Sequence, residues 1–463
     1  MSRLLTAGSL AGAFLLLLIL PGWAGAQEPT SEDCLACHQD PGLQRSAPGP
    51  GRPPSVSVDR VRLQGSVHGG LACVACHKTA TAPHDERLPR VACAGCHDQA
   101  RAALREGIHG NPPRPARAPA PTCAGCHGAH AVRPAASLGA ESCAACHRRE
   151  AAAYRESVHG RSRAQGASAA ATCRSCHGTA HALLPAKDAR AATYHLNLPR
   201  TCAQCHADPE LIKRYRIPVG DVYKLYLDSI HGRALTRSGL LVAANCSDCH
   251  GVHDIRPRAD RASRVFPANV PQTCGTCHAG VLQAYAESVH GRAVAKGSQT
   301  APVCTSCHTA HQIRRVEAAP WQLEVIRECG TCHRESLRTY RDTFHGKVTA
   351  LGFARVAKCA DCHGAHTIQP AADPRSAVSR TRIVATCAQC HRGATASFAE
   401  FHPHAEPTDR ARFPKLYYPY VFMTGLLVAV FGFFGLHTLL WLPRSLVERL
   451  RGRGTGGRED AAS

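Results

Sequence analysis

The sequence Cys34-Leu-Ala-Cys37-His38 decides how this chain is built, because the pattern Cys-x-x-Cys-His occurs in it 13 times. The chain has 26 cysteines, and every one belongs to such a motif. The pattern is typical of c-type haem attachment: two thiols reach the two vinyl groups, and the adjoining histidine binds the iron from one face as the proximal ligand. A lone Cys-x-x-Cys can also hold zinc or exchange thiols, but neither zinc sites nor disulfide scaffolds require the histidine.

The motifs, numbered 1–13 in chain order, supply the residues expected to hold haem. Their cysteine pairs are Cys34 and Cys37, Cys73 and Cys76, Cys93 and Cys96, Cys123 and Cys126, Cys143 and Cys146, Cys173 and Cys176, Cys202 and Cys205, Cys246 and Cys249, Cys274 and Cys277, Cys304 and Cys307, Cys329 and Cys332, Cys359 and Cys362, and Cys387 and Cys390. Their proximal histidines are His38, His77, His97, His127, His147, His177, His206, His250, His278, His308, His333, His363 and His391.

A second set of histidines recurs in two sequence contexts. Seven resemble Ser-Val-His-Gly: His68, His109, His159, His231, His290, His345 and, as a degenerate last copy, His402. Six resemble Cys-x-x-Cys-His-Gly-x-His: His84, His130, His181, His253, His311 and His366. Together they equal the motifs in number, so we expect one distal ligand for each iron and bis-histidine coordination throughout. His195 and His404 are left over, the latter as a rival to His402.

The spacing excludes some pairings. Axial ligands approach an iron from opposite faces, with Cα atoms on the order of 12 Å apart. His127 and His130 are joined by chain that spans at most about 10 Å. His147 and His159 are joined by a stretch that reads as a helix, which would hold them about 18 Å apart. Each distal histidine is therefore expected to bind a neighbouring haem and to tie successive haems into one string.

The two contexts alternate, which gives a two-haem repeat. The repeats begin at Cys34, Cys93, Cys143, Cys202, Cys274 and Cys329, with a half repeat at Cys387. About 30 residues per haem is too little chain for sheets or a side-chain core, and aromatic residues make up only 5% of the sequence. The expected fold is short α-helices and coil packed around a string of 13 covalent haems, followed by one C-terminal transmembrane helix.

The two ends of the chain indicate export and membrane anchoring. Residues 1–26 read as a secretory signal, with Arg3, an apolar run and the cleavage pattern Ala24-Gly25-Ala26; an uncleaved anchor is the alternative. Residues 27–415 are expected to form a periplasmic haem domain. Residues 416–443 are long and apolar enough to cross a bilayer. Residues 444–463 form an arginine-rich tail that the positive-inside rule places in the cytoplasm.

His437 lies inside the predicted membrane span, where an ionisable residue indicates a functional site. Three roles are open for it. It would ligate a b-type haem shared with a partner, hydrogen-bond a quinone, or hydrogen-bond a neighbour on its own helix.

The net charge of +21 first suggests a nucleic-acid or anionic-membrane partner. Each oxidised bis-histidine haem has two propionates against one net positive charge at the iron core, so thirteen would contribute about −13. The basic residues are therefore interpreted as counter-charges to propionates, with no nucleic acid as partner.

Residues 34–404 resemble the bacterial multihaem cytochromes c with doubled Cys-x-x-Cys-His motifs. The segment Phe434-Gly-Leu-His437-Thr-Leu-Leu-Trp441 resembles the membrane anchors of cytochrome bc-type quinone oxidoreductases. The resemblance implies electron transfer in anaerobic respiration between the membrane quinone pool and periplasmic cytochromes. It also implies an integral membrane b-type or quinone-oxidising subunit as partner.

Two other functions compete with this one. A terminal reductase of nitrite, hydroxylamine or a sulfur oxyanion would need an iron with an open axial position. An extracellular conduit or filament subunit conflicts with the C-terminal anchor. The motifs themselves predict no catalytic residue, since bis-histidine iron suits outer-sphere electron transfer.

Overall fold

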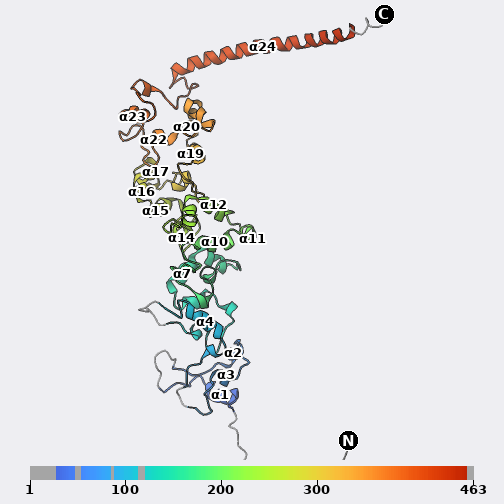
Figure 1. The fold of residues 1–463 in the computed structure, drawn as a ribbon, viewed down its shortest axis with the longest axis vertical. Helices are drawn as coiled ribbons and strands as arrows, with labels where there is room; N and C mark the ends of the chain where they lie inside the picture. The colour runs from blue at the N-terminus through green and yellow to red at the C-terminus, as the bar shows by residue number, and fades with distance from the viewer. Residues whose placement is uncertain (1–27, 47–53, 85–87, 113–119, 456–463) are drawn as a thin grey trace, which may run out of the picture. The chain divides into compact units, whose positions relative to one another are not determined.

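The computed structural model describes residues 28–46, 54–84, 88–112 and 120–455, and its regular structure there is helical (Figure 1). Within these ranges, β-type pairing is limited to an antiparallel bridge between Gln44 and Ser55. The expected fold of short helices and coil with one long C-terminal helix is confirmed. The predicted signal sequence, residues 1–26, lies outside the described residues.

The chain divides into two compact units. The first contains residues 1–155 and 159–194, and the second residues 156–158 and 195–463. The helices up to residue 194 are α1 (Ser31–His38), α2 (Arg60–Gln64), α3 (Cys73–Cys76), η1 (Cys93–Gly95), α4 (Asp98–Glu106), α5 (Cys123–His127), η2 (Ala135–Ser137), α6 (Ala140–Ala144), α7 (Arg148–Glu156), α8 (Val158–Ala164), α9 (Cys173–His177) and η3 (Ala180–Ala182).

The later helices follow the same scale until the last one. They are α10 (Leu198–His206), α11 (Pro209–Arg214), α12 (Val222–Asp228), α13 (Ile230–Thr236), α14 (Cys246–His250), η4 (Pro267–Asn269), α15 (Val270–Gly275), α16 (Ala279–Ala286), α17 (Val289–Ala295), α18 (Cys304–His308), α19 (Ala319–Cys332), α20 (Arg334–Asp342), α21 (Phe344–Ala350), α22 (Cys359–His363), α23 (Ile383–Ala388), η5 (Phe398–Glu400) and α24 (Pro414–Thr455).

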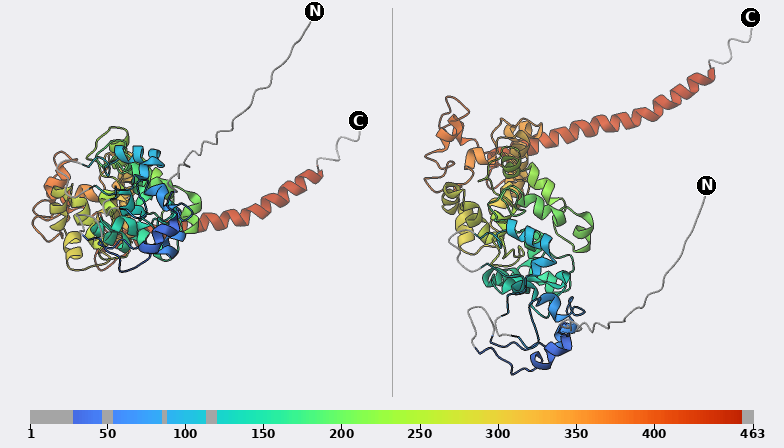
Figure 2. Two further views of the ribbon diagram at one scale, coloured as in Figure 1. Left: turned by 90° about the horizontal axis from the view of Figure 1, so that it is seen from below. Right: turned by 60° about the horizontal axis from the view of Figure 1, so that its bottom comes forward.

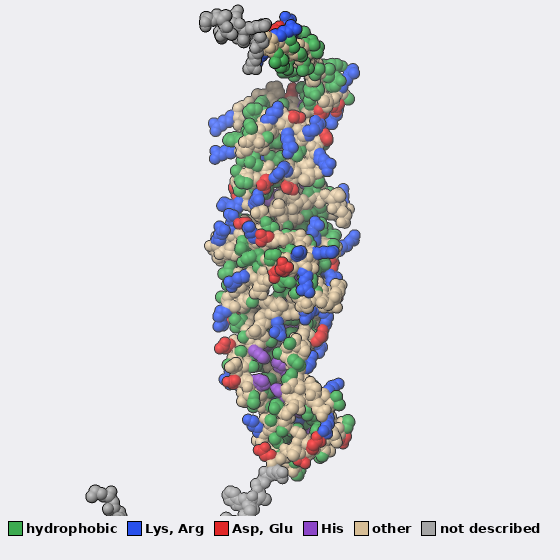
Figure 3. All heavy atoms as spheres, turned by 90° about the vertical axis from the view of Figure 1, so that its right-hand side faces the viewer, with side chains coloured by type: hydrophobic (Ala, Val, Ile, Leu, Met, Phe, Trp, Pro, Cys, Tyr) green, Lys and Arg blue, Asp and Glu red, His purple; other side chains and the backbone are tan. Residues whose placement is uncertain are grey.

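Few apolar side chains are buried among the described residues. They are Leu35, Ala151, Ala191, Leu235, Ala243, Val270, Val303, Ile326 and Tyr340, of which three are alanines. Such small and scattered groups cannot supply the apolar burial that a chain of this length needs to stay folded. The side chains alone therefore do not build a core. On the face drawn in Figure 3, Lys and Arg side chains are scattered rather than gathered into one patch.

The last helix, α24, differs from all the others in length and surroundings. Its residues from Pro414 to Arg451 have a mean hydropathy of 2.0 in their most apolar window, and that window has no buried residue. Figures 1 and 2 show it running clear of the other helices of the second unit. The helix continues past the expected span of residues 416–443. Pro443 lies inside the helix, and Arg444 forms an ion pair with Glu448, one turn further on, at 3.1 Å. Such a helix is consistent with membrane anchoring.

Candidate haem-binding sites

The even-numbered motifs from motif 4 onward form short helices that end in one unusual backbone conformation. In α5, α9, α14 and α22 the residue after the proximal histidine is a glycine with φ between 80° and 87° and an extended ψ. That combination is open almost only to glycine, because a Cβ would clash with the backbone. The Gly of Cys-x-x-Cys-His-Gly-x-His is therefore the residue that stops the helix and turns the chain. In α18 Thr309 adopts the same conformation, with φ 62°.

Ten proximal histidines face a distal histidine across a gap of nearly constant width. The pairs are His38 with His84, His77 with His130, His97 with His68, His127 with His181, His147 with His109, His250 with His311, His278 with His231, His308 with His366, His333 with His290, and His391 with His345. Their ring centres are 5.8 to 6.3 Å apart. An eleventh proximal ring, His363, faces His404 at 6.2 Å.

This gap fits one iron. A metal lies about 2 Å from each imidazole nitrogen that binds it, and that nitrogen lies roughly 1.1 Å from its ring centre. Two rings on opposite faces of one iron therefore have centres about 6.2 Å apart. Rings in direct contact would have closer centres. The constant separation of the ring centres therefore matches that of two rings bound to one metal atom. Each proximal ring also follows two cysteines in sequence, so the residues present fit a c-type haem.

The pairs follow a simple rule along the chain. A distal histidine in the Ser-Val-His-Gly context faces the proximal histidine two motifs further on, as His290 faces His333 of motif 11. A distal histidine in the Gly-x-His context faces the proximal histidine two motifs back, as His311 faces His250 of motif 8. His84 of motif 2 is the exception, because it faces His38 of motif 1, one motif back. The spacing argument predicted that each distal histidine serves a neighbouring haem. In nine of the ten pairs the structure places the partner two motifs away, and for His84 it places the partner one motif away. Of the other predicted ligands, His159 and His177 lie in the first unit, and His206 and His253 lie in the second.

The Ser-Val-His-Gly segment joins two helices at a very close crossing. In α17, Ser288 caps the helix by accepting from the backbone N–H of Gly291 at 3.0 Å, and its hydroxyl donates to the carbonyl of Tyr285 at 2.7 Å. A Cβ on Gly291 would lie 2.0 Å from that carbonyl oxygen. The same clash exists at Gly160, Gly232 and Gly346, so the glycine next to each of these distal histidines is required by the approach of the preceding helix.

A tyrosine three residues before the serine or threonine is part of this arrangement, and the sequence analysis missed it. The hydroxyls of Tyr154, Tyr226, Tyr285 and Tyr340 donate to the carbonyls of Ala171, Ala244, Pro302 and Ala357, at distances of 2.8 to 3.1 Å. Each acceptor lies two residues before the first cysteine of the following motif. The extended pattern Tyr-x-x-Ser/Thr-x-His-Gly was the signal available in the sequence. These tyrosines fix the segment that bears a distal histidine against the next haem-binding motif.

The two kinds of distal segment are also tied to each other through the backbone. The residue before the Ser-Val-His-Gly histidine donates its N–H to a carbonyl two residues after a Gly-x-His histidine. The bonds run from Val67 to Val132, Ile108 to Leu183, Val158 to Ile255, Ile230 to Ile313, and Val289 to Ile368, at 2.7 to 3.1 Å. Five repetitions of one backbone bond show that the two histidine contexts form one structural unit.

Neighbouring motifs lie against each other within each unit. The first cysteines of paired motifs are in hydrogen-bonding contact, as in Cys34 with Cys73, Cys93 with Cys123, Cys143 with Cys173, Cys202 with Cys246, Cys274 with Cys304, and Cys329 with Cys359. The second cysteine of one pair interacts electrostatically with the next pair, as Cys126 does with Cys143 and Cys362 with Cys387. Motifs 1–6 and motifs 7–13 are thus two unbroken successions.

Burial favours the neutral, metal-binding form of some of these rings. Burial, and then the neighbouring His38 and His84, lower the pKa of His77. Burial likewise lowers the pKa of His130, with a smaller contribution from His77. His38 donates from Nδ1 to the carbonyl of Val56 at 2.8 Å, which leaves the lone pair of Nε2 for an iron.

His195, one of the two leftover histidines, has a structural role. Its Nε2 donates to the carbonyl of Ala243 at 2.9 Å, and its Nδ1 lies 3.0 Å from the amide nitrogen of Asn245. Asn245 is 2% exposed and caps α14, the helix of motif 8. With both ring nitrogens engaged, His195 supports a motif rather than binding an iron. His404, the other leftover histidine, lies opposite His363 of motif 12, whereas the ring of His402 contacts Phe413.

Comparisons with known proteins agree with this geometry. A family model described as Cytochrome c3 matches residues 67–148, the stretch that contains motifs 2–5. The Cytochrome c-type protein NrfB of Escherichia coli O6:H1 is 29% identical over 140 residues, which are 29% of this chain and 71% of that protein. No solved structure matches the chain.

Proposed function

We propose that this chain, a multihaem c-type cytochrome, transfers electrons in anaerobic respiration between a quinol-oxidising membrane partner and periplasmic acceptors such as other cytochromes. In this proposal the chain holds 13 haems, one at each motif. Each haem would supply a one-electron redox centre when bound. Residues 1–26 direct export, residues 27–415 act in the periplasm, and α24 anchors the chain in the inner membrane.

The observation that carries the proposal is the constant gap of 5.8 to 6.3 Å between opposed imidazoles. Two protein nitrogens on one iron leave no position for a substrate, which suits outer-sphere electron transfer. A terminal reductase needs an open axial position, and the ten opposed pairs offer none at their own sites. We infer bis-histidine ligation for these ten sites with the partners that face each other in the structure.

The succession of motifs supports transfer through each unit. The contacts between first cysteines would bring the attachment edges of two bound haems together in each doubled motif. The contacts between second cysteines and the next pair continue the sequence through the unit. In the segments that bear His159, His231, His290 and His345, the tyrosine and the glycine would hold the distal histidine in a fixed position against the next motif.

The membrane part of the proposal rests on α24 and its charges. Arg444, Arg449 and Arg451 follow the apolar stretch, so the positive-inside rule puts this end in the cytoplasm and the motifs in the periplasm. A single helix has no room for a complete quinol site, so a multi-span subunit with b-type haem or a quinone site must accompany it. His437 lies exposed on α24 and is available to such a subunit as a haem ligand or a quinone hydrogen-bonding group.

The test uses native membranes that contain the full-length protein. A quinol analogue should reduce the c-type haems, and an inhibitor of quinol oxidation should stop this reduction while dithionite still reduces every haem. Purification in mild detergent should yield an integral b-type or quinone-oxidising subunit. A protein that reduces nitrite or hydroxylamine by itself, with a five-coordinate ferric haem, would contradict the proposal in favour of the reductase.

A further inference from the structure

The last even-numbered motif has no successor that could supply its distal ligand by the general rule. Motifs 8 and 10 receive theirs from the Gly-x-His segments of motifs 10 and 12. Motif 12 would need a fourteenth motif, and residues 392–463 contain no Cys-x-x-Cys-His. The structure instead brings the linker before α24 to this position, so that His404 faces His363 with ring centres 6.2 Å apart. This separation lies within the range of the ten other pairs.

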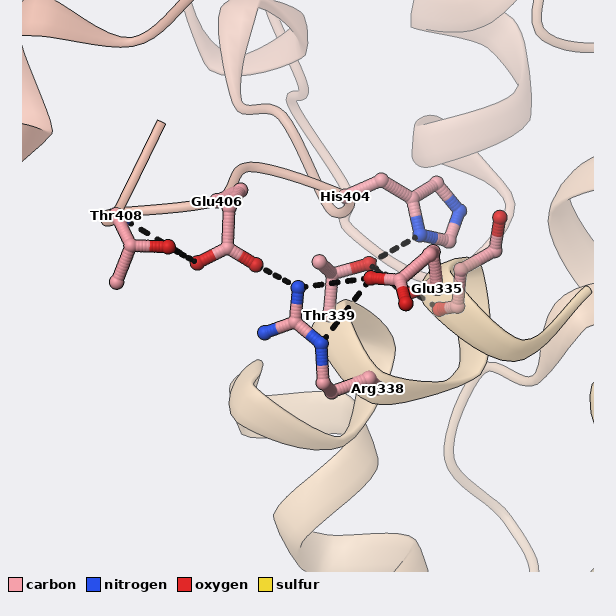
Figure 4. Close-up of polar contacts among 7 residues, drawn as sticks. Glu335, Arg338, Thr339, His404, Glu406 and Thr408 are labelled. Atoms are coloured by element: carbon pink, nitrogen blue, oxygen red, sulfur yellow. Dashed lines mark hydrogen bonds and ion pairs between the residues drawn. The ribbon is translucent and has the colours of Figure 1, made fainter. Parts of the chain in front are cut away.

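The linker is attached to α20 by side chains (Figure 4). Arg338 of α20 forms an ion pair with Glu406, whose side chain is only 17% exposed, and also binds Glu335 at 2.9 Å. The other carboxylate oxygen of Glu406 accepts from the hydroxyl of Thr408 at 2.6 Å. Thr339, which is 6% exposed, contacts Nδ1 of His404 at 3.1 Å through its hydroxyl oxygen.

These contacts select the form of His404 that can bind a metal. The Thr339 hydroxyl lies 3.0 Å from the carbonyl of Glu335 and 3.2 Å from that of Ser336, and its single hydrogen serves these acceptors. The hydroxyl oxygen therefore accepts from Nδ1–H of His404. With the proton on Nδ1, the lone pair of Nε2 is free for an iron. His38 likewise donates from Nδ1, to the carbonyl of Val56, and keeps the lone pair of Nε2 free.

His402, two residues earlier, lies in a different environment. Its ring is edge-on to Phe413 at 6.0 Å, and Phe413 immediately precedes α24. Among the ring contacts of the described residues, the one facing His363 belongs to His404. His402 is therefore an internal control: the same residue type in the same linker, but packed against an aromatic ring.

We propose that the linker into the membrane helix carries the distal iron ligand of motif 12, His404, and that Thr339 and Arg338 are positioning residues that hold it. This proposal rests on the proposed haem binding at Cys359, Cys362 and His363. The five pairs of distal segments described above are each joined by a backbone hydrogen bond, which among substitutions only a proline at the donor residue would remove directly. The linker that bears His404 is instead held by the ion pair of Arg338 with Glu406 and by the hydroxyl of Thr339, so single side-chain substitutions can release it.

The position of this ligand links motif 12 to the membrane anchor. Nine residues separate His404 from the start of α24, and Glu406 within them is fixed to α20. Of the histidines that face a proximal ring among the described residues, His404 is thus the one nearest to the anchor in sequence.

The experiment compares single variants of the full-length protein by ferric EPR and by CO binding to the dithionite-reduced form. His404→Ala should convert about one haem in thirteen to a high-spin, CO-binding form. His402→Ala should leave the spectra unchanged. Thr339→Val should give a partial signal and Thr339→Ser should restore the parent spectrum. Arg338→Ala should give a partial signal, whereas Arg334→Ala on the same helix should give none.

Each outcome decides the proposal. A high-spin haem in His402→Ala, or fully low-spin haem in His404→Ala, would overturn the assignment of His404. Equal spectra for Thr339→Val and Thr339→Ser, with no effect of Arg338→Ala, would overturn the positioning roles. Haem per chain is counted by mass spectrometry in every sample. A parent protein that lacks haem at motif 12 would refute the proposed haem binding and not the ligand assignment.

Discussion

Gly291 offers a sharp test of the helix crossing that presents a distal histidine. An alanine Cβ at this position would lie 2.0 Å from the carbonyl oxygen of Tyr285 and 2.8 Å from its carbon. An ordinary carbon–oxygen contact is about 3.3 Å, so α16 and α17 would have to separate by about 1.3 Å. Both atoms of the clash belong to backbone, so no side-chain rotation can relieve it. Gly291→Ala should therefore move His290 relative to its partner.

The cost of Gly291→Ala follows from the contacts at the crossing. Overpacking a close contact costs about 1–3 kcal/mol. Moving Tyr285 away from Ser288 also breaks the hydrogen bond from the Ser288 hydroxyl to the Tyr285 carbonyl, which is worth about 1 kcal/mol. The sum is about 2–4 kcal/mol. The same displacement would widen the gap between His290 and His333 beyond the observed 6.3 Å, which already matches the span of one iron.

The assay measures thermal unfolding and ferric spin state in parallel, with Gly280→Ala as the matched control. Gly280 also lies in α16, and an added Cβ there would meet no heavy atom within 4 Å. The control should keep or slightly raise the unfolding midpoint, because alanine favours a helix over glycine. Gly291→Ala should lower the midpoint by several degrees and make the haem of motif 11 high-spin. Identical behaviour of the two variants would refute the account of the crossing.

Three further predictions concern single features. Thr309→Gly should stabilise the protein by about 1 kcal/mol in a thermal melt, because it removes a positive-φ strain while losing one exposed hydrogen bond; a lower midpoint would contradict this. Tyr285→Phe should destabilise by about 1 kcal/mol, because it removes the hydroxyl that donates to Pro302, whereas Tyr215→Phe at the surface should not. Deleting residues 414–463 should move the cytochrome from the membrane pellet to the soluble fraction, and its retention would count against α24 as the anchor.

The sequence allowed the haem-attachment motifs, the absence of a side-chain core and the C-terminal helix to be predicted. These features are local. The thiols and the proximal histidine of each motif lie within five residues, and the C-terminal helix is recognised from one uninterrupted apolar stretch. The helix expected between His147 and His159 is α7, Arg148–Glu156, and His159 itself lies in the next helix, α8. The glycine that follows the proximal histidine is visible in the sequence. The reason for it, a positive φ at Gly128, Gly178, Gly251 and Gly364, is visible only in the structure.

The pairing of distal with proximal histidines could not be predicted, because it depends on contacts between segments far apart in the chain. Chain-length arguments excluded pairs such as His127 with His130, but they could not choose between a partner one motif away and a partner two motifs away. The role of His195 depends on Asn245, 50 residues later. The choice between His402 and His404 depends on Thr339, 65 residues from His404.

The central claim is that every motif holds a haem whose iron has two histidine ligands. Ferric EPR of the intact, full-length protein, with haem counted by mass spectrometry on the same sample, tests it most directly. The account predicts a mass increase of thirteen haems on the 26 cysteines and low-spin signals alone. Fewer haems, or a stoichiometric high-spin signal in the parent protein, would contradict it.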